Sequence, residues 1–137
     1  MGLRVVRVDA ADQGLRLAES MGTSAVVVEP RSQNALETVQ QLAKHHQLSG
    51  LDAAIILPER QRAFGYGISL VKNHGRCVVV SFPKRGFTFS GMDVVFRDIS
   101  IVSSLVGSNK TSNEMLEFAA DHDIKPALKM YGFQDLN

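Results

Sequence analysis

A chain of 137 residues has room for one folded domain with a sizeable core, and no room for a second one. Its 45% hydrophobic and 21% charged residues are typical of an ordinary globular protein and exclude a disordered chain. The net charge of +1 gives no basic footprint for nucleic acid or an anionic membrane, so small molecules or other proteins are the expected partners.

The first predicted strand and helix lie between Leu3 and Gly22. The β-branched run Leu3–Val8 predicts a strand that ends at Asp9. Asp12 is placed to cap the helix that follows, and Gly22 is placed to close it.

A second strand and helix follow. The run Ala25–Val28 predicts the strand, and Ser32 or Asn34 opens the helix. We interpret His45 and His46, near the helix end, as solvated rather than metal-binding, because neighbouring residues of a helix point to different faces. The apolar stripe of this helix is predicted to be Leu36, Val39, Leu42 and Ala43.

Two further strands flank a helix in the middle of the chain. Asp52–Leu57 predicts the third strand, and a helix over Gln61–Lys72 is predicted to end at the turn Asn73–Gly75. Arg76–Phe82 predicts the fourth strand. It carries the only cysteine, Cys77, which we interpret as a buried strand residue rather than a nucleophile or ligand.

The pattern changes in the last third of the chain. Gly86–Phe89 predicts a short exposed strand, and Met92–Phe96 a single helical turn. Ile99–Val106 predicts the fifth buried strand. A capping box that begins at Thr111 opens the last helix, and the tail after Pro126 is predicted to be a final edge segment.

Strands that alternate with helices predict an α/β fold, a parallel sheet covered by helices on both faces. A phosphoacceptor receiver domain has the same alternation, but it needs an aspartate where the third strand ends, and Leu57-Pro58-Glu59 stands there. No apolar run could span a bilayer and no secretion signal is evident, so we expect a cytoplasmic protein outside membranes.

Several short sequence segments occur in the order and with the spacing that they have in one protein family. They are Val8-Asp9, Ala18–Gly22, Leu51–Ala54, Asn73–Val80, Phe96–Ile101, Ser104–Gly107, Leu116–Ala120 and Ile124–Pro126. Together, over nearly the whole chain, they resemble the nucleotide-binding domain of the medium-chain dehydrogenase/reductases, the family that includes the zinc-type alcohol dehydrogenases.

This resemblance implies a single truncated Rossmann-like domain over residues 1–137. In the family, the first strand leads into a glycine-rich turn whose backbone amides hold the coenzyme pyrophosphate. The present chain starts at the family's second strand. The family's first strand, its glycine-rich turn and the zinc-carrying catalytic domain therefore have no counterpart in it. Because unpaired edges inside a sheet are costly, we expect one five-stranded sheet in the family order 3-2-4-5-6, or completion by a swapped dimer.

The resemblance also implies where a coenzyme would lie. Asp9 matches the acid that hydrogen-bonds the adenosine ribose and selects NAD over NADP, although Asp9 or Asp12 would equally serve as a helix cap. The other predicted coenzyme-binding residues follow the ends of strands, and as apolar or small residues most of them also suit an ordinary core. They are Leu57, Val80, Ser81, Phe82, Ser104, Val106 and Asn109.

Three positions depart from the family pattern. Gly14 stands where many relatives have a lysine beside the adenosine, and Asn109 where many have a cation near the pyrophosphate. Ser81 replaces a glycine that lets the backbone approach the nicotinamide ring. We therefore expect NAD to bind weakly or not at all and no zinc to bind, and we assign no catalytic residue.

The segment Gly86–Asp93 is predicted to join two copies of the chain edge to edge. Phe87-Thr88-Phe89 alternates apolar and polar residues, and no proline or charge between Gly86 and Met92 blocks strand pairing. Dimers of the family form by antiparallel pairing of this kind, so we expect a homodimer. A hairpin folded back on its own sheet is the alternative.

Three descriptions of function remain open. The chain is a fragment of a longer NAD-dependent alcohol dehydrogenase, a free-standing truncated relative that binds a ligand or a protein, or a relative with a new cofactor-free reaction in the old cleft. Met1 favours a natural short chain, and the weakened phosphate-facing charges argue against use of a dinucleotide.

Overall fold

The computed structural model describes residues 2–23 and 25–135 and separates into two compact units, Met1–Ser104 and Leu105–Asn137. Each unit has its own secondary structure. In the described part of the chain, no helix is both long and apolar enough to cross a membrane.

The first unit alternates short strands with helices. Its elements are β1 (Val6–Val8), α1 (Asp12–Ser20), β2 (Val26–Val28), α2 (Ala35–His46), β3 (Leu51–Ile56), α3 (Gln61–Leu70), β4 (Val71–Val79), α4 (Gly91–Val95) and β5 (Ser100–Ser103). Every strand pair is parallel. This architecture confirms the predicted α/β class, with parallel sheets flanked by helices.

The strands form two sheets, so the prediction of one five-stranded sheet is wrong for the single chain. β1 pairs with β2, while β3, β4 and β5 form a separate sheet in that order. In the described residues no strand bridges β1 and β3. α2 connects β2 to β3 and packs against α3, and its Thr38 hydroxyl lies 2.7 Å from the Tyr66 hydroxyl.

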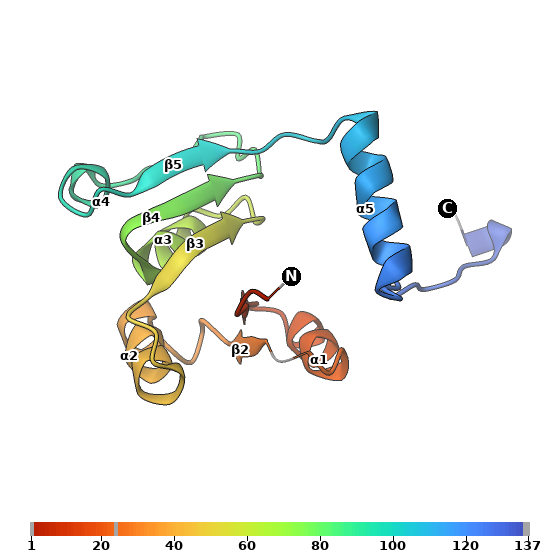
Figure 1. Cartoon of the computed structure of the whole chain (residues 1–137), viewed down its shortest axis with the longest axis horizontal. Helices are drawn as coiled ribbons and strands as arrows, with labels where there is room; N and C mark the ends of the chain where they lie inside the picture. Colours follow the sequence, from red (N-terminus) through yellow and green to blue (C-terminus); the bar gives the residue numbers. More distant parts are fainter. Residues whose placement is uncertain (1, 24, 136–137) are drawn as a thin grey trace. The chain divides into compact units, whose positions relative to one another are not determined.

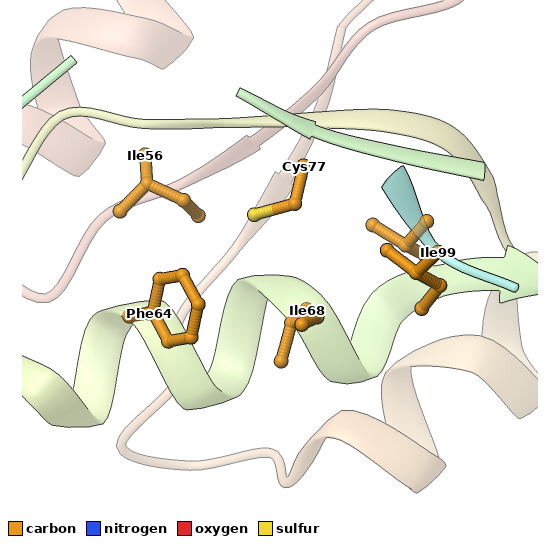
Figure 2. Close-up of a cluster of buried hydrophobic side chains, with 6 residues drawn as sticks. Ile56, Phe64, Ile68, Cys77 and Ile99 are labelled. Atoms are coloured by element: carbon orange, nitrogen blue, oxygen red, sulfur yellow. The ribbon is translucent and has the colours of Figure 1, made fainter. Parts of the chain in front are cut away.

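One face of the three-stranded sheet is covered by α3. Figure 1 shows β3, β4 and β5 side by side with α3 behind them. Phe64 and Ile68 of α3 pack against Ile56, Cys77 and Ile99, and none of these side chains is more than 4% exposed (Figure 2). Cys77 is buried as predicted, and its burial raises the pKa of the thiol.

The α3 helix ends earlier than predicted, at Leu70, and β4 follows at once. The cause is Arg97, far away in the sequence. Its guanidinium donates hydrogen bonds to the carbonyl oxygen of Ile68, at 3.4 Å, and to that of Val71. Carbonyls at a helix end lack partners within the helix, so Arg97 caps α3 from outside.

The turn predicted at Asn73–Gly75 lies inside β4. The register of the β3–β4 ladder is irregular at this point, and His74 has a left-handed φ of +61°. The turn is therefore an interruption of the strand rather than a loop before it.

The strand predicted at Gly86–Phe89 is wrong, because the structure has no strand there, although Gly86, Thr88 and Phe89 are exposed as predicted. Phe87 turns inward and its ring stacks on Phe64, with 4.7 Å between the ring centroids. The side-chain amide of Gln61 pairs with both backbone groups of Thr88: Thr88 N–H donates to Oε1 at 2.8 Å, and Nε2 donates to the Thr88 carbonyl at 2.6 Å. The helical turn predicted to follow is confirmed as α4.

The α2 helix is capped by Asn34, one of the two residues predicted to open it. The Asn34 side chain accepts from the Glu37 N–H at 2.9 Å, and the Glu37 carboxylate accepts from the Asn34 N–H at 2.9 Å. Of the predicted apolar stripe only Leu42 is fully buried, whereas Leu36 is 67% exposed. Thr38 is buried instead, because its hydroxyl has Tyr66 as a partner.

The second unit contains α5 (Asn109–Asp121) and the 3₁₀ turn η1 (Phe133–Asp135). α5 starts before the predicted capping box at Thr111, because the Ser108 hydroxyl already accepts from the Thr111 N–H at 3.1 Å. The described residues after Pro126 contain η1 and no strand, so the predicted edge segment is also wrong.

The packing of Phe64 predicts a large loss of stability when its ring is removed. Phe64→Ala should lower the free energy of unfolding by about 3–5 kcal/mol, since a buried ring and its stacking partner are lost together. Leu36→Ala, at a position that is 67% exposed, is the control and should cost less than about 0.5 kcal/mol. Urea unfolding followed by circular dichroism measures both, and equal losses would contradict this account of the core.

Candidate functional site

The three parallel strands β3, β4 and β5 bring five predicted site residues to one edge. They are Leu57, Val80, Ser81, Phe82 and Ser104, each at or just after the end of a strand. The ladder continues past the strand ends, since Val80 N–H donates to the Ile56 carbonyl at 3.1 Å and Ser104 N–H to the Val79 carbonyl at 3.0 Å. Parallel strands end on the same side of a sheet, so these residues form one carboxyl edge.

The exposure of this edge separates two interpretations that the sequence left open. Leu57 is 68% exposed and Phe82 is 67% exposed, while Val80 and Ser81 are half-buried. Core residues of that size would be buried, so Leu57 and Phe82 are not part of the core. The edge presents apolar side chains to solvent, as a surface that contacts an apolar or planar ligand would.

Ser81 connects the ends of two strands. Its hydroxyl donates a hydrogen bond of 2.9 Å to the carbonyl of Pro58, which follows β3. The hydroxyl proton is therefore engaged, and only the oxygen lone pairs remain to accept from a ligand. This geometry gives Ser81 a structural bond and no activated nucleophile.

Asp9, the predicted ribose-binding acid, ends β1 and folds back on the start of α1. Its Oδ1 accepts from the Ala11 N–H at 2.9 Å. A Cβ atom added to Gly14 would lie 2.0 Å from Asp9 Oδ2, so the carboxylate rests directly on the Gly14 backbone. Asp9 therefore stabilises the turn before α1, and an alanine at position 14 would require its carboxylate to move.

An ion-pair cluster beside this turn was not anticipated. Arg31 forms a salt bridge of 2.5 Å with Asp12 and a second one with Glu29, the residue after β2. Asp12 is the first residue of α1 and not its side-chain cap, which corrects the role predicted for it. The Arg31 guanidinium lowers the pKa of the Asp12 carboxyl, first by its hydrogen bond and then by its charge. The pairing of Asp12 with Arg31 joins residues 19 positions apart, so no local pattern predicts it.

The remaining two predicted residues belong to the second unit. Val106 is 90% exposed and has a left-handed φ of +39°, and Asn109 is the first residue of α5. The structure thus brings the five residues of the carboxyl edge together, and it leaves Asp9 on the other sheet.

No catalytic or metal-binding group stands out in the described residues. Among them, no three His, Cys, Asp or Glu side chains are close enough to hold a metal ion. His74 pairs with Asp98 at 2.9 Å and is exposed, and His122 Nδ1 lies 2.9 Å from the Phe118 carbonyl in its own helix. A hollow of about 800 Å³ lies near the start of β4, lined by Leu36, Val39, Lys72 and Arg97 among others, and contains none of the predicted residues.

Comparison with known proteins gives a consistent picture over the whole chain. Residues 1–121 match the family model of the zinc-binding dehydrogenases. Two alcohol dehydrogenases of Geobacillus stearothermophilus are 31% and 28% identical to the chain over all 137 residues. The chain spans 39% of the length of each of these relatives.

Solved structures show the same fold. An alcohol dehydrogenase from the hyperthermophilic archaeon Aeropyrum pernix matches 96% of the chain with a TM-score of 0.76 and 22% identity. A protein of Sinorhizobium meliloti 1021 described as a zinc-binding dehydrogenase, solved bound to NADP, matches 90% with a TM-score of 0.71 and 20% identity. This chain covers 37% and 36% of those two chains.

The contact between Asp9 and Gly14 predicts an unusual response to alanine. Replacing a helical glycine by alanine normally stabilises a protein by about 0.4–1 kcal/mol. Gly65→Ala in α3, where an added Cβ meets nothing within 4 Å, should show this gain. Gly14→Ala should show none or a loss, because the Asp9 carboxylate must move away.

The double variant Asp9→Ala/Gly14→Ala is the control for this assignment. Without the carboxylate, the alanine at position 14 should again be tolerated, so the two substitutions should be strongly non-additive in urea unfolding. A gain for Gly14→Ala equal to that for Gly65→Ala would refute the contact.

Proposed function

This chain belongs to the zinc-binding dehydrogenase family, and from that premise we propose that it is a truncated relative or fragment of an NAD-dependent alcohol dehydrogenase, without dehydrogenase activity on its own. The family model runs from residue 1 to 121 across both compact units, which supports a single domain over residues 1–137. The chain covers 39% of the Geobacillus alcohol dehydrogenases. The zinc-carrying catalytic domain that the family implies has no counterpart in these 137 residues.

The observation that carries the proposal is the carboxyl edge of β3, β4 and β5. In a parallel sheet, ligands bind outside the carboxyl ends of the strands. Leu57 and Phe82 are exposed there although they are large and apolar, which favours contact with a planar ring over a role in the core. NAD, when bound, would supply the hydride-accepting nicotinamide ring, and Leu57, Val80 and Phe82 would provide its apolar contacts.

We propose that this edge holds NAD weakly or not at all. Asp9 would be the ribose acceptor, and its Oδ1 already accepts a hydrogen bond from the Ala11 N–H. The predicted phosphate-facing positions carry no charge, since they are Gly14 and Asn109. No glycine-rich turn is present to offer backbone donors to a pyrophosphate.

A second candidate function uses the same edge without redox chemistry. The Ser81 hydroxyl is engaged by Pro58, and the neighbouring exposed residues are apolar, an arrangement that favours binding of an apolar ligand or protein over a new cofactor-free reaction.

The cytoplasmic location expected from the sequence remains a prediction.

We also propose that the chain forms a homodimer through Gly86–Asp93, by side-chain contacts instead of strand pairing. Phe87 and the backbone of Thr88 are already engaged within the chain. Phe89 is 51% exposed and Met92 is 58% exposed, so the segment still offers apolar surface to a second copy. An interface of this kind would be isologous, with the same segment contributed by both copies.

The coenzyme proposal predicts the outcome of a calorimetric titration. Each lost hydrogen bond to a charged phosphate is worth about 1.5–3 kcal/mol, and about 1.4 kcal/mol is tenfold in affinity. Loss of two or three such bonds should therefore leave NAD binding in the millimolar range or weaker. Micromolar binding, or alcohol-dependent formation of NADH by the purified chain, would overturn the proposal.

The dimer proposal predicts a concentration-dependent sedimentation coefficient. Phe89→Ser/Met92→Ser should shift the protein to monomer in analytical ultracentrifugation, because the exposed apolar contact is removed. Leu36→Ser is the matched control, since Leu36 is 67% exposed on α2 outside the segment, and it should not change the equilibrium. A wild-type chain that sediments as a monomer at high micromolar concentration would rule out the dimer.

A further inference from the structure

The carboxyl edge includes two loops that hydrogen bonds hold together. The first loop follows β3 and leads into α3, and the second follows β4. The Ser81 hydroxyl of the second loop donates to the Pro58 carbonyl of the first at 2.9 Å. Nε2 of Gln61 donates to the Thr88 carbonyl at 2.6 Å, and the Thr88 N–H donates back to Oε1 at 2.8 Å. The stretches 58–61 and 81–88 therefore lie against each other.

Both loops are basic. Their cations are Arg60 and Arg62, at the start of α3, and Lys84 and Arg85, in the turn after Pro83. The only acid in the stretches 57–62 and 81–88 is Glu59, although the whole chain has a net charge of just +1. Positive charge is therefore concentrated at this edge and offset by acids elsewhere in the chain.

The four cations of these loops are available to a partner. All four are exposed, and in the part of the chain that the structure describes no carboxylate forms an ion pair with any of them. By contrast, Arg31, Lys72 and Arg97 each pair with an acid. The N–H donors of the four unpaired side chains therefore point to solvent and can bind an anion.

Large apolar side chains lie next to these cations in the sequence. Leu57 is 68% exposed and stands three residues before Arg60, and Phe82 is 67% exposed and stands two residues before Lys84. The loops thus present apolar area and unpaired positive charge together. We call the surface formed by these residues the basic edge; its members are Leu57, Arg60, Arg62, Phe82, Lys84 and Arg85.

The chemistry of the basic edge specifies its partner. Covering Leu57 and Phe82 requires apolar side chains, and a carboxylate suits the guanidinium groups because it accepts two parallel hydrogen bonds. The hollow of about 800 Å³ near the start of β4 includes none of these six residues. A small molecule needs an enclosed pocket for most of its surface, whereas a peptide spreads its contacts over an exposed surface of this kind.

We propose that the basic edge binds an acidic segment of a partner protein, in which Asp or Glu residues alternate with large apolar ones. The carboxylates would pair with the cations of the two loops, and the apolar side chains would cover Leu57 and Phe82. This inference rests on the second candidate function, binding at the carboxyl edge without redox chemistry, and it does not depend on NAD.

The first test measures fluorescence anisotropy of a labelled peptide of about twelve residues that repeats Glu-Leu-Asp-Phe, kept at nanomolar concentration and without NAD. Two control peptides separate charge from apolar contact: one repeats Gln-Leu-Asn-Phe and the other Glu-Ser-Asp-Ser. Because the basic edge uses both kinds of contact, each control should bind at least about tenfold more weakly. Raising NaCl from about 50 to about 500 mM should weaken binding of the Glu-Leu-Asp-Phe peptide by about fivefold or more.

Charge reversal checks the basic edge from the protein side. Arg60→Glu/Lys84→Glu reverses one cation in each loop and should weaken binding of the acidic peptide at least about tenfold. Arg16→Glu/Lys44→Glu makes the same change of net charge at exposed cations of α1 and α2, and should weaken binding less than about twofold. Arg60→Lys/Lys84→Arg keeps both charges and should bind as the wild type does. Circular dichroism checks that each variant is folded.

The outcomes separate this proposal from the binding function on which it rests. Equal binding of the Gln-Leu-Asn-Phe peptide would overturn the acidic partner and leave an apolar binding edge, whereas no saturable binding of any peptide up to about 1 mM would remove both. Equal losses in the reversed and control variants would also overturn the proposal, as would tighter binding of a thymidine oligonucleotide or a phosphatidylserine vesicle. If Arg60→Glu/Lys84→Glu does not fold, Arg62→Glu/Arg85→Glu tests the same surface.

Discussion

The burial of one apolar face of α3 against β3, β4 and β5 is the contact on which the rest of the structure depends. Phe64 and Ile68 fill the space over Cys77, so the three strands are held in register under one helix. The same helix fixes its surroundings, because Gln61 and Phe64 hold the segment at Thr88 and Phe87. Tyr66 on α3 also positions α2. The chain around this core is therefore arranged by side chains of a single helix.

The candidate site is a consequence of that arrangement. Because the three strands are parallel and in register, their carboxyl ends lie at one edge of the sheet. Leu57 and Phe82 remain exposed at that edge. The exposed side chains of Leu57 and Phe82 give this edge an apolar surface. An exposed apolar edge of this kind is the feature on which the proposed function depends.

The sequence by itself determined the class of fold, the order of the elements and the family. The class of fold and the order of the elements follow from local signals: β-branched runs, the Asn34 capping box, the apolar run around Cys77 and the glycine after α1. The family follows from the resemblance of short sequence segments along the chain. Such signals act over a few residues, so they are readable from a single chain. Most of the predicted coenzyme-edge residues were also found together, because the edge on which a parallel strand ends follows from the order of the elements.

Only the tertiary structure decided the features that depend on residues far apart in sequence. Arg97 ends α3, Gln61 occupies the backbone of Thr88, and Arg31 pairs with Asp12, and no local pattern marks any of these partners. The division into two sheets also depends on segments far apart in sequence, since a helix separates the two strands of every pair. Local propensity limits which backbone shapes a segment adopts, but the partner that satisfies each buried or edge group is set by long-range packing.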